Sequence, residues 1–190
     1  MKTPDTEPVR SVGIIGSRKL DYQHAKQVGA VVDDLVSRDY HIATGGAVGA
    51  DQYVVEQLLR QGISNKGTVY AAWRNYTGFP VQVRAMIRQF RDQGGHILWG
   101  ASSGKEEYTI VKMGLLLHNK RLVDACYGLV AFIDPHSRGS IFTLKKATEK
   151  RQVVVVFPHD CDLPTIHYVK WAPLRCGGCW EGGYKAVYLK

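Results

Sequence analysis

The sequence predicts an α/β fold with a doubly wound, mostly parallel sheet and helices on both faces. Short apolar runs alternate with segments of helical periodicity between residues 10 and 158. The first two apolar runs each end at a glycine turn, and a helical segment follows each turn. Parallel neighbours need a crossover, usually a helix, so this alternation covers both faces of the sheet. A hydrophobic content of 45% is enough to fill the core.

Each expected element rests on its own pattern of apolar residues. Ala25, Val28, Val32 and Leu35, for example, are at helical spacing and form a face for packing on the sheet. The expected helices are 21–38, 50–60, 81–93, 108–125 with a break near Asn119, and 140–150. The expected strands are 12–15, 40–43, 68–72, 97–99 (a weak pattern between glycines), 129–133 and 153–157.

The chain divides into three parts by composition. Residues 1–9 are polar with two prolines, and we expect a flexible N-terminal arm. Residues 10–158 form the α/β domain, and residues 159–190 form a loop-rich C-terminal extension packed on it. No apolar run approaches the roughly 20 residues of a membrane helix, and the start lacks the apolar region of a signal peptide. We therefore expect a cytoplasmic protein with no membrane partner.

Two glycine turns follow the first two expected strands. The first is Gly16-Ser17-Arg18-Lys19, and the second is Gly45-Gly46-Ala47-Val48-Gly49-Ala50-Asp51. Carboxyl ends of parallel strands meet at one edge of a sheet, where a helix N-terminus offers free N–H donors and a partial positive charge. Glycine also lets the backbone approach a phosphate closely. The sequence therefore predicts a nucleotide or nucleic-acid phosphate site at this edge.

The charge balance favours an anionic partner. The chain has 25 Lys and Arg against 17 Asp and Glu, a formal net charge of +8. Nucleic acid is the leading candidate, and a basic protein without a polyanion partner is the alternative. No Walker A spacing, Ser-His-Asp triad or paired-carboxylate site is present in the sequence, which argues against ATP hydrolysis and hydrolysis by a serine nucleophile.

A third motif, Ser137-x-Gly139-Ser140-x-x-Thr143, follows a later strand. With the two glycine turns, it resembles the Smf/DprA–LOG superfamily of Rossmann-like domains across about residues 10–157. The third motif and Asn119-Lys120-Arg121 are similar to the DNA-processing protein A (DprA, Smf) branch. The second turn and Ala72-Trp73 also resemble small stand-alone members that bind nucleotides.

The resemblance implies a role for each motif. Ser17, Arg18 and Lys19 would meet a phosphate, and Gly45, Gly46 and Gly49 would shape the second phosphate loop. Asp51 would order that loop or meet a ribose hydroxyl, or would only complement the helix N-terminus. The third anion-binding turn would consist of Ser137, Gly139, Ser140 and Thr143, with Arg138 adding charge. Asn119 and Arg121 would face the same edge, although Arg121 could instead simply complement a helix end.

The function implied is that of a DprA-like protein that binds a nucleotide or single-stranded nucleic acid, with a homodimer as its assembly. No cofactor is predicted beyond a bound nucleotide. The alternative is an enzyme that acts on a nucleotide or nucleoside phosphate in the same cleft. The cytokinin-activating phosphoribohydrolases carry a catalytic glutamate where this chain has Thr143, which argues against their reaction.

Three further features have both a functional and a structural interpretation. Trp73, Tyr76 and Phe79 either stack on bases or pack over the sheet edge. Arg84, Arg88 and Arg91 either follow a phosphate backbone or form a solvated helix face. Cys176 and Cys179 would need Cys161 with His159 or His167 to complete a zinc site, so we interpret them as free cysteines and predict no metal site.

Overall fold

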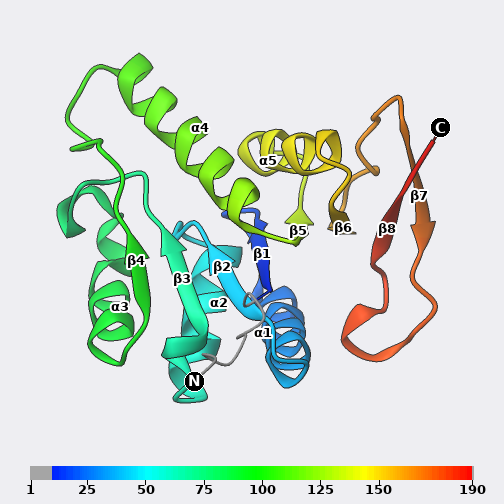
Figure 1. The fold of residues 1–190 in the computed structure, drawn as a ribbon, viewed down its shortest axis with the longest axis horizontal. Coiled ribbons are helices and arrows are strands. Elements are labelled where there is room, and N and C mark those ends of the chain that lie inside the picture. Colours follow the sequence, from blue (N-terminus) through cyan, green and yellow to red (C-terminus); the bar gives the residue numbers. More distant parts are fainter. Residues whose placement is uncertain (1–9, 190) are drawn as a thin grey trace, which may run out of the picture.

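The computed structural model describes residues 10–189, which form one eight-stranded sheet in the order β4-β3-β2-β1-β5-β6-β8-β7 (Figure 1). The strands from β4 to β6 in this order are parallel to their neighbours, whereas β8 pairs antiparallel with both β6 and β7. The strands are β1 (Ser11–Gly16), β2 (His41–Thr44), β3 (Gly67–Tyr70), β4 (His96–Leu98), β5 (Gly128–Ile133), β6 (Val153–Pro158), β7 (Val169–Pro173) and β8 (Tyr184–Tyr188).

Helices cover both faces of the sheet, as the sequence predicts. One core cluster joins the sheet to α1, α2 and α3 through Val28, Val54 and Ile87, and the other joins it to α4 and α5 through Leu122 and Leu144. In Figure 1 the first three helices lie in the lower part and the other two in the upper part. The helices are α1 (Tyr22–Ser37), α2 (Ala50–Arg60), α3 (Val81–Asp92), α4 (Tyr108–Ala125) and α5 (Arg138–Glu149), with short helical turns η1 (Ser64–Lys66), η2 (Tyr76–Gly78) and η3 (Gly178–Trp180).

The direction in which the strands follow one another reverses between β1 and β5. From β1 the chain builds β2, β3 and β4 on one side, and β5 and β6 then continue on the other side. In open α/β sheets the crevice outside the carboxyl ends at such a reversal is where ligands bind. The fold therefore directs attention to the residues that follow β1 and β5.

Two details differ from the sequence prediction. The predicted break near Asn119 is wrong, because α4 is continuous from Tyr108 to Ala125. An asparagine inside a helix costs only a few tenths of a kcal/mol when its neighbours are good helix formers, as the leucines before it are. No strand was predicted after residue 158, yet β7 and β8 form an antiparallel hairpin there that extends the sheet.

The remaining predictions about the chain's organisation concern its start and a membrane-spanning segment. The predicted N-terminal arm, residues 1–9, lies outside the described residues. Between residues 10 and 189, no helix is both long enough and apolar enough to cross a membrane.

Candidate functional site

The first and second glycine turns touch each other backbone to backbone. Gly49 has a φ of +89°, and a Cβ added to it would lie 2.2 Å from the carbonyl oxygen of Ser17 and 2.6 Å from Cα of Arg18. The N–H of Ala50 donates to the same Ser17 carbonyl at 3.0 Å. Gly16 is equally confined, because its Cβ would lie 2.3 Å from the carbonyl oxygen of Phe132. Glycine is therefore the residue that fits both positions.

Asp134, which directly follows β5, joins the first turn to the third. Its two carboxylate oxygens accept hydrogen bonds from Oγ of Ser17 at 2.6 Å and from Oγ of Ser137 at 2.7 Å. The N–H of His136 donates to the same carboxylate at 2.9 Å. Burial alone would raise the pKa of Asp134, but the bonds from Ser17, Ser137 and His136 outweigh it and hold this pKa below its usual value.

This carboxylate changes what the two serines can do. Sequence reasoning assigned the hydroxyl of Ser17 to a phosphate and Ser137 to an anion-binding turn, yet both hydroxyl protons are donated to Asp134. An anion at this point would have to compete with a carboxylate that the chain itself supplies. Asp134 was missed in the sequence, although its place between a buried strand and the third motif is a signal that could have identified it.

The second turn is built around a buried carboxyl group. Asp51, at the start of α2, is 7% exposed, and its Oδ2 accepts a hydrogen bond from the N–H of Ala47 at 3.2 Å. Burial raises the pKa of Asp51 to about 6, against the opposing effects of the Ala47 amide and the Arg18 guanidinium. This geometry gives Asp51 contact with its own loop.

A second titratable group, the half-buried His118 of α4, lies against this turn. A Cβ on Gly45 would lie 2.8 Å from Oδ2 of Asp51 and 3.3 Å from Nε2 of His118. Burial, with smaller contributions from the charges of Arg121 and Arg18, lowers the pKa of His118 to about 4. The Cα of Arg18 would lie 2.6 Å from a Cβ on Gly49, and Arg121 is three residues after His118 on α4. His118 directly precedes the Asn119-Lys120-Arg121 motif, and sequence reasoning gave it no role.

The two polar residues predicted on α4 lie close to this point. The guanidinium of Arg121 donates to the carbonyl oxygen of Trp99 at 3.2 Å, beyond the end of β4. Asn119 is half-buried one residue after His118. The basic group of Arg121 therefore lies beside the sheet edge that carries the turns.

The third motif divides into exposed and internal residues. Gly139 is exposed at the start of α5, and nothing lies within 4 Å of the position its Cβ would take. Ser140 is half-buried in the same first helical turn. Thr143 is 1% exposed, and its hydroxyl donates to the carbonyl oxygen of Gly139 at 3.0 Å. Thr143 is thus internal to α5, while Arg138, like Arg18 and Lys19, is exposed.

The aromatic loop before α3 is packed on itself. Trp73 is half-buried, and a Cβ on Gly78 would lie 2.6 Å from the Cβ of Trp73. The ring of Tyr76 meets that of Trp99 edge to face, with centroids 4.9 Å apart. Phe79 is 1% exposed and belongs to the core. These contacts agree with the structural interpretation, in which the aromatic side chains pack over the sheet edge.

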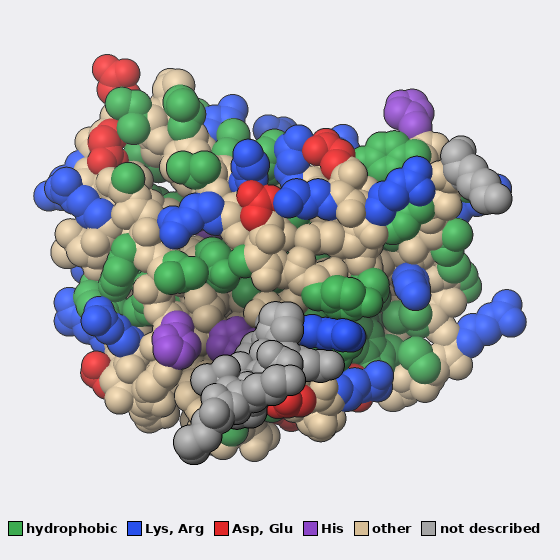
Figure 2. Space-filling view, in the orientation of Figure 1, with side chains coloured by type: hydrophobic (Ala, Val, Ile, Leu, Met, Phe, Trp, Pro, Cys, Tyr) green, Lys and Arg blue, Asp and Glu red, His purple; other side chains and the backbone are tan. Residues whose placement is uncertain are grey.

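The arginines predicted to form a stripe on α3 have different surroundings. The guanidinium of Arg84 donates to the backbone carbonyls of Thr77 and Phe79, each at 3.0 Å, and that of Arg88 lies 5.1 Å over the ring of Tyr76. Arg91 is exposed near the end of the helix. Figure 2 shows Lys and Arg side chains spread over the visible face among hydrophobic and acidic ones.

Cys176 and Cys179 of the C-terminal extension are the candidates for a zinc site. Cys176 is exposed, and Cys179, in η3, packs partly against the core. In the part of the chain that the structure describes, no group of three or more His, Cys, Asp or Glu side chains is arranged to hold a metal ion.

Known proteins resemble this chain over most of its length. A family model described as DNA recombination-mediator protein A matches residues 3–167. DNA processing protein A from Streptococcus pneumoniae superposes with a TM-score of 0.63 and 22% identity, over 80% of this chain and 51% of that chain. The Helicobacter pylori protein of the same name, whose structure concerns its single-stranded DNA binding mode, superposes with a TM-score of 0.64 and 21% identity. This match covers 79% of this chain and 66% of that chain.

A more distant structure has the same fold. The molybdenum cofactor binding protein from Rippkaea orientalis superposes with a TM-score of 0.56 and 11% identity, over 82% of this chain and 80% of that chain. No curated protein matches the chain. At these identities the likenesses establish the Rossmann-like fold, and the chain spans about half the length of the S. pneumoniae protein.

Proposed function

Because the chain belongs to the DNA recombination-mediator protein A family, we propose that it binds single-stranded DNA at the carboxyl edge of its sheet. The observation that carries the proposal is the junction of three turns. The first turn touches the second through Gly49 and the third through Asp134, so backbone from three strand ends converges on one place. The H. pylori relative, described as binding single-stranded DNA, supports the choice of ligand.

The chemistry of this edge suits a phosphate backbone. Arg18, Lys19 and Arg138 are exposed, so their charges are free to meet successive phosphates. The N-termini of α2 and α5 lie at the same edge, and the first N–H groups of a helix have no partner within it. Contacts of this kind read no sequence, so the proposal is for binding without strong base preference.

Asp134 sets a condition on this proposal. Its carboxylate holds the donors of Ser17 and Ser137, so the first phosphate would be met by Arg18 and Lys19 and by the backbone of the second turn. The two serines would contribute only if Asp134 gave up its hydrogen bonds. DNA processing is in the name of the S. pneumoniae and H. pylori proteins, and strand binding is the part proposed for this chain.

The salt dependence of binding tests the proposal. The affinity for a fluorescent 20-nucleotide strand would be measured between 50 and 300 mM salt for the wild type, Arg18→Ala and Arg91→Ala. Loss of one phosphate contact should flatten the slope of log K against log salt by about 0.7 for Arg18→Ala. Arg91 is the matched control, because it is exposed at the carboxyl end of α3, which lies at the opposite edge of the sheet from the glycine turns, and its loss should leave the slope unchanged. Equal slopes for all three proteins would contradict phosphate binding at the first turn.

One observation favours the enzymatic alternative, in which the same edge acts on a nucleotide. Asp51 is a buried carboxyl whose pKa is raised to about 6, and such groups are common in active sites. Against this, Asp51 is 7% exposed and bonded to the amide of Ala47. Strand binding therefore remains the function that the arrangement supports best.

A further inference from the structure

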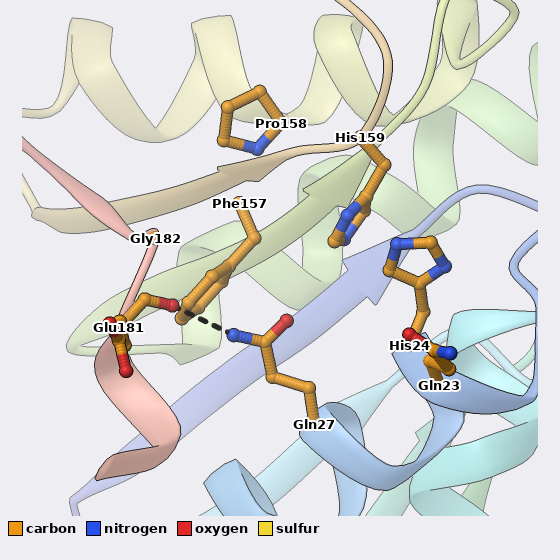
Figure 3. Close-up of a pocket in the computed structure, with 8 residues that line it drawn as sticks. All are labelled: Gln23, His24, Gln27, Phe157, Pro158, His159, Glu181 and Gly182. Atoms are coloured by element: carbon orange, nitrogen blue, oxygen red, sulfur yellow. Dashed lines mark hydrogen bonds between the residues drawn. The ribbon is translucent and has the colours of Figure 1, made fainter. Parts of the chain in front are cut away.

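A cavity of about 410 Å³ lies beside the proposed strand-binding edge, between α1, the end of β6 and the segment that joins η3 to β8. Figure 3 shows its lining, with side chains from α1 and from the end of β6 facing one another and the backbone of Glu181 and Gly182 on the third side. We name it the α1–β6 pocket. It is lined by Gln23, His24, Gln27, Phe157, Pro158, His159, Glu181 and Gly182.

The side-chain amide of Gln27 has a fixed orientation in this pocket. Its nitrogen donates to the backbone carbonyls of Glu181 at 3.0 Å and Cys179 at 3.4 Å. Carbonyl oxygens only accept hydrogen bonds, so the other end of the amide must be the oxygen. Figure 3 shows this oxygen directed into the space between Phe157 and the two histidine rings. The pocket therefore holds a positioned hydrogen-bond acceptor.

Aromatic rings form one side of the pocket. His159 is parallel to Phe132 within 4°, with centroids 6.0 Å apart, and His24 meets His159 edge to face at 3.7 Å. Phe157 forms the floor and stacks between Phe132 and Trp180. Burial lowers the pKa of His159 to about 4, and His24 adds to the shift, so His159 is a neutral ring at neutral pH.

The pocket continues into a second hollow that reaches the glycine turns. This hollow, about 180 Å³, shares His24 and His159 with the first and is also lined by Lys19 and Asp134. Lys19 belongs to the first turn, and Asp134 joins that turn to the third. A ligand with an anionic part at the turns could thus extend another part past the histidines into the α1–β6 pocket.

We propose that the α1–β6 pocket receives a nucleobase, either of a free nucleotide or of one residue in a bound strand. The inference rests on the proposed function, because the phosphate would lie at the glycine turns. A nucleobase matches the lining: it is planar, uncharged, and bears ring-edge donors for the oxygen of Gln27. A second anionic group would instead meet the carboxylates of Glu181, Asp21 and Asp160 around the two hollows.

The wall formed by Glu181 and Gly182 belongs to the C-terminal segment of the chain. This segment, with β7, η3 and β8, follows the residues that the family model matches, 3–167. This wall is anchored on α1, because Nε1 of Trp180 donates to Oδ2 of Asp34 at 2.9 Å and Gln27 holds the backbone of Glu181. The hairpin that extends the sheet therefore also closes the α1–β6 pocket.

A matched pair of variants at Gln23 tests the subsite. Gln23 is exposed at the rim, so Gln23→Trp should fill the pocket and Gln23→Ala should leave it open, both without harm to the fold. Affinities would be measured for deoxyadenosine monophosphate and for 2-deoxyribose 5-phosphate, which lacks the base. The wild type and Gln23→Ala should bind the nucleotide about tenfold more tightly than they bind the sugar phosphate. Gln23→Trp should lose most of this preference.

NMR signals of the imidazoles give a second readout. The signals of His24 and His159 should shift on addition of the nucleotide and not of the sugar phosphate. Thymidine strands and abasic strands of equal length then separate the two sources of the base. A preference for the thymidine strand that Gln23→Trp removes assigns the pocket to a strand, and a preference confined to the mononucleotide assigns it to a free nucleotide.

The outcomes separate this inference from the proposed function. If Arg18→Ala flattens the salt slope as expected, but the wild type shows no base preference or Gln23→Trp shows an equal one, the pocket is overturned and strand binding stands. If no strand binds, the proposed function fails, and the nucleotide titration decides the pocket on its own. Absence of shifts at His24 and His159 in that titration overturns it.

Discussion

Gly49 lies directly against the backbone of Ser17, so closely that a single added carbon would come within 2.2 Å of the Ser17 carbonyl oxygen. This carbonyl also accepts the N–H of Ala50, the first residue of α2. The start of α2 and the end of β1 are therefore fixed to each other without any side chain. The close approach explains why the second turn needs a glycine there, independently of any ligand.

Gly49→Ala should therefore damage both stability and strand binding. The new carbon would clash with Ser17 and Arg18, and a φ of +89° is strained for alanine, so we expect a loss of about 3 kcal/mol in the free energy of unfolding. Gly139→Ala is the control, because its Cβ would meet open space in a helix. Chemical denaturation measures the free energy of unfolding of both variants, and titration of the fluorescent strand measures their binding. A Gly49→Ala protein as stable as Gly139→Ala would contradict the contact.

Asp134→Asn should strengthen strand binding. The asparagine oxygen can keep the bonds from Ser137 and His136, while its nitrogen takes the place of the oxygen that faces Ser17. The hydroxyl of Ser17 is then free to donate to a phosphate, and one negative charge is removed. We expect an affinity gain of about threefold at 50 mM salt, smaller at higher salt. Unchanged or weaker binding would place the phosphates away from Ser17.

The three turns could be predicted because they depend on the backbone. Glycine after a buried strand marks a junction with a helix, and parallel strands bring such junctions to one edge. The role of Asp134 could not be predicted in this way. It depends on β5 lying beside β1, and the order of strands in a sheet is not contained in local periodicity. The same holds for His118, whose place at Gly45 depends on how α4 crosses the sheet.

The hairpin β7–β8 was missed for a local reason. Pro173 ends β7, and the connection to β8 contains paired glycines and η3, so turn residues dominate the segment. The alternation in β8 is carried largely by Ala186, a small buried residue between exposed Lys185 and Val187. Pairing with β6 supplies the remaining stabilisation, and that contact is long-range.

Incubation with AMP should release no adenine. The catalytic glutamate of the phosphoribohydrolases has no counterpart, because Thr143 is buried and its hydroxyl is bonded within α5. Glu149, the nearest acid in that helix, pairs with Lys146 at 2.7 Å near its other end. Chromatography of the reaction mixture measures the free base. A burst of adenine that Arg18→Ala abolishes would instead favour the enzymatic alternative.

A homodimer is the assembly that the family resemblance implies, and α4 offers an apolar surface for it. Ile110, Met113 and Leu117 are each more than half exposed and share one face of the helix. Light scattering at tens of micromolar protein should give twice the mass of one chain, and Met113→Glu should give a monomer. Val81→Glu, at the exposed start of α3, is the control and should leave the dimer intact. A monomeric wild type would contradict the prediction.

Asp51→Asn should stabilise the protein in a pH-dependent way. Burial raises the pKa of Asp51 to about 6, so the folded state holds this proton more tightly than the unfolded chain does. The stability that Asp51 contributes is therefore complete below about pH 4 and falls as the pH rises through 6.

Asparagine keeps an acceptor for the amide of Ala47 and cannot ionise. Its advantage over aspartate should grow between pH 4 and pH 7 by at most about 3 kcal/mol. His118 lies beside Asp51 at Gly45, so its protonation in acid is coupled to this carboxyl. The change between pH 5.5 and pH 8, above the lowered pKa values of about 4 of His118 and His159, therefore isolates the effect of Asp51. Urea unfolding at pH 4, 5.5, 7 and 8 measures the difference, with exposed Asp92→Asn as a control that should show no such trend. A difference that stays constant over this range would show that the Asp51 carboxyl is ionised in the folded protein as readily as in water.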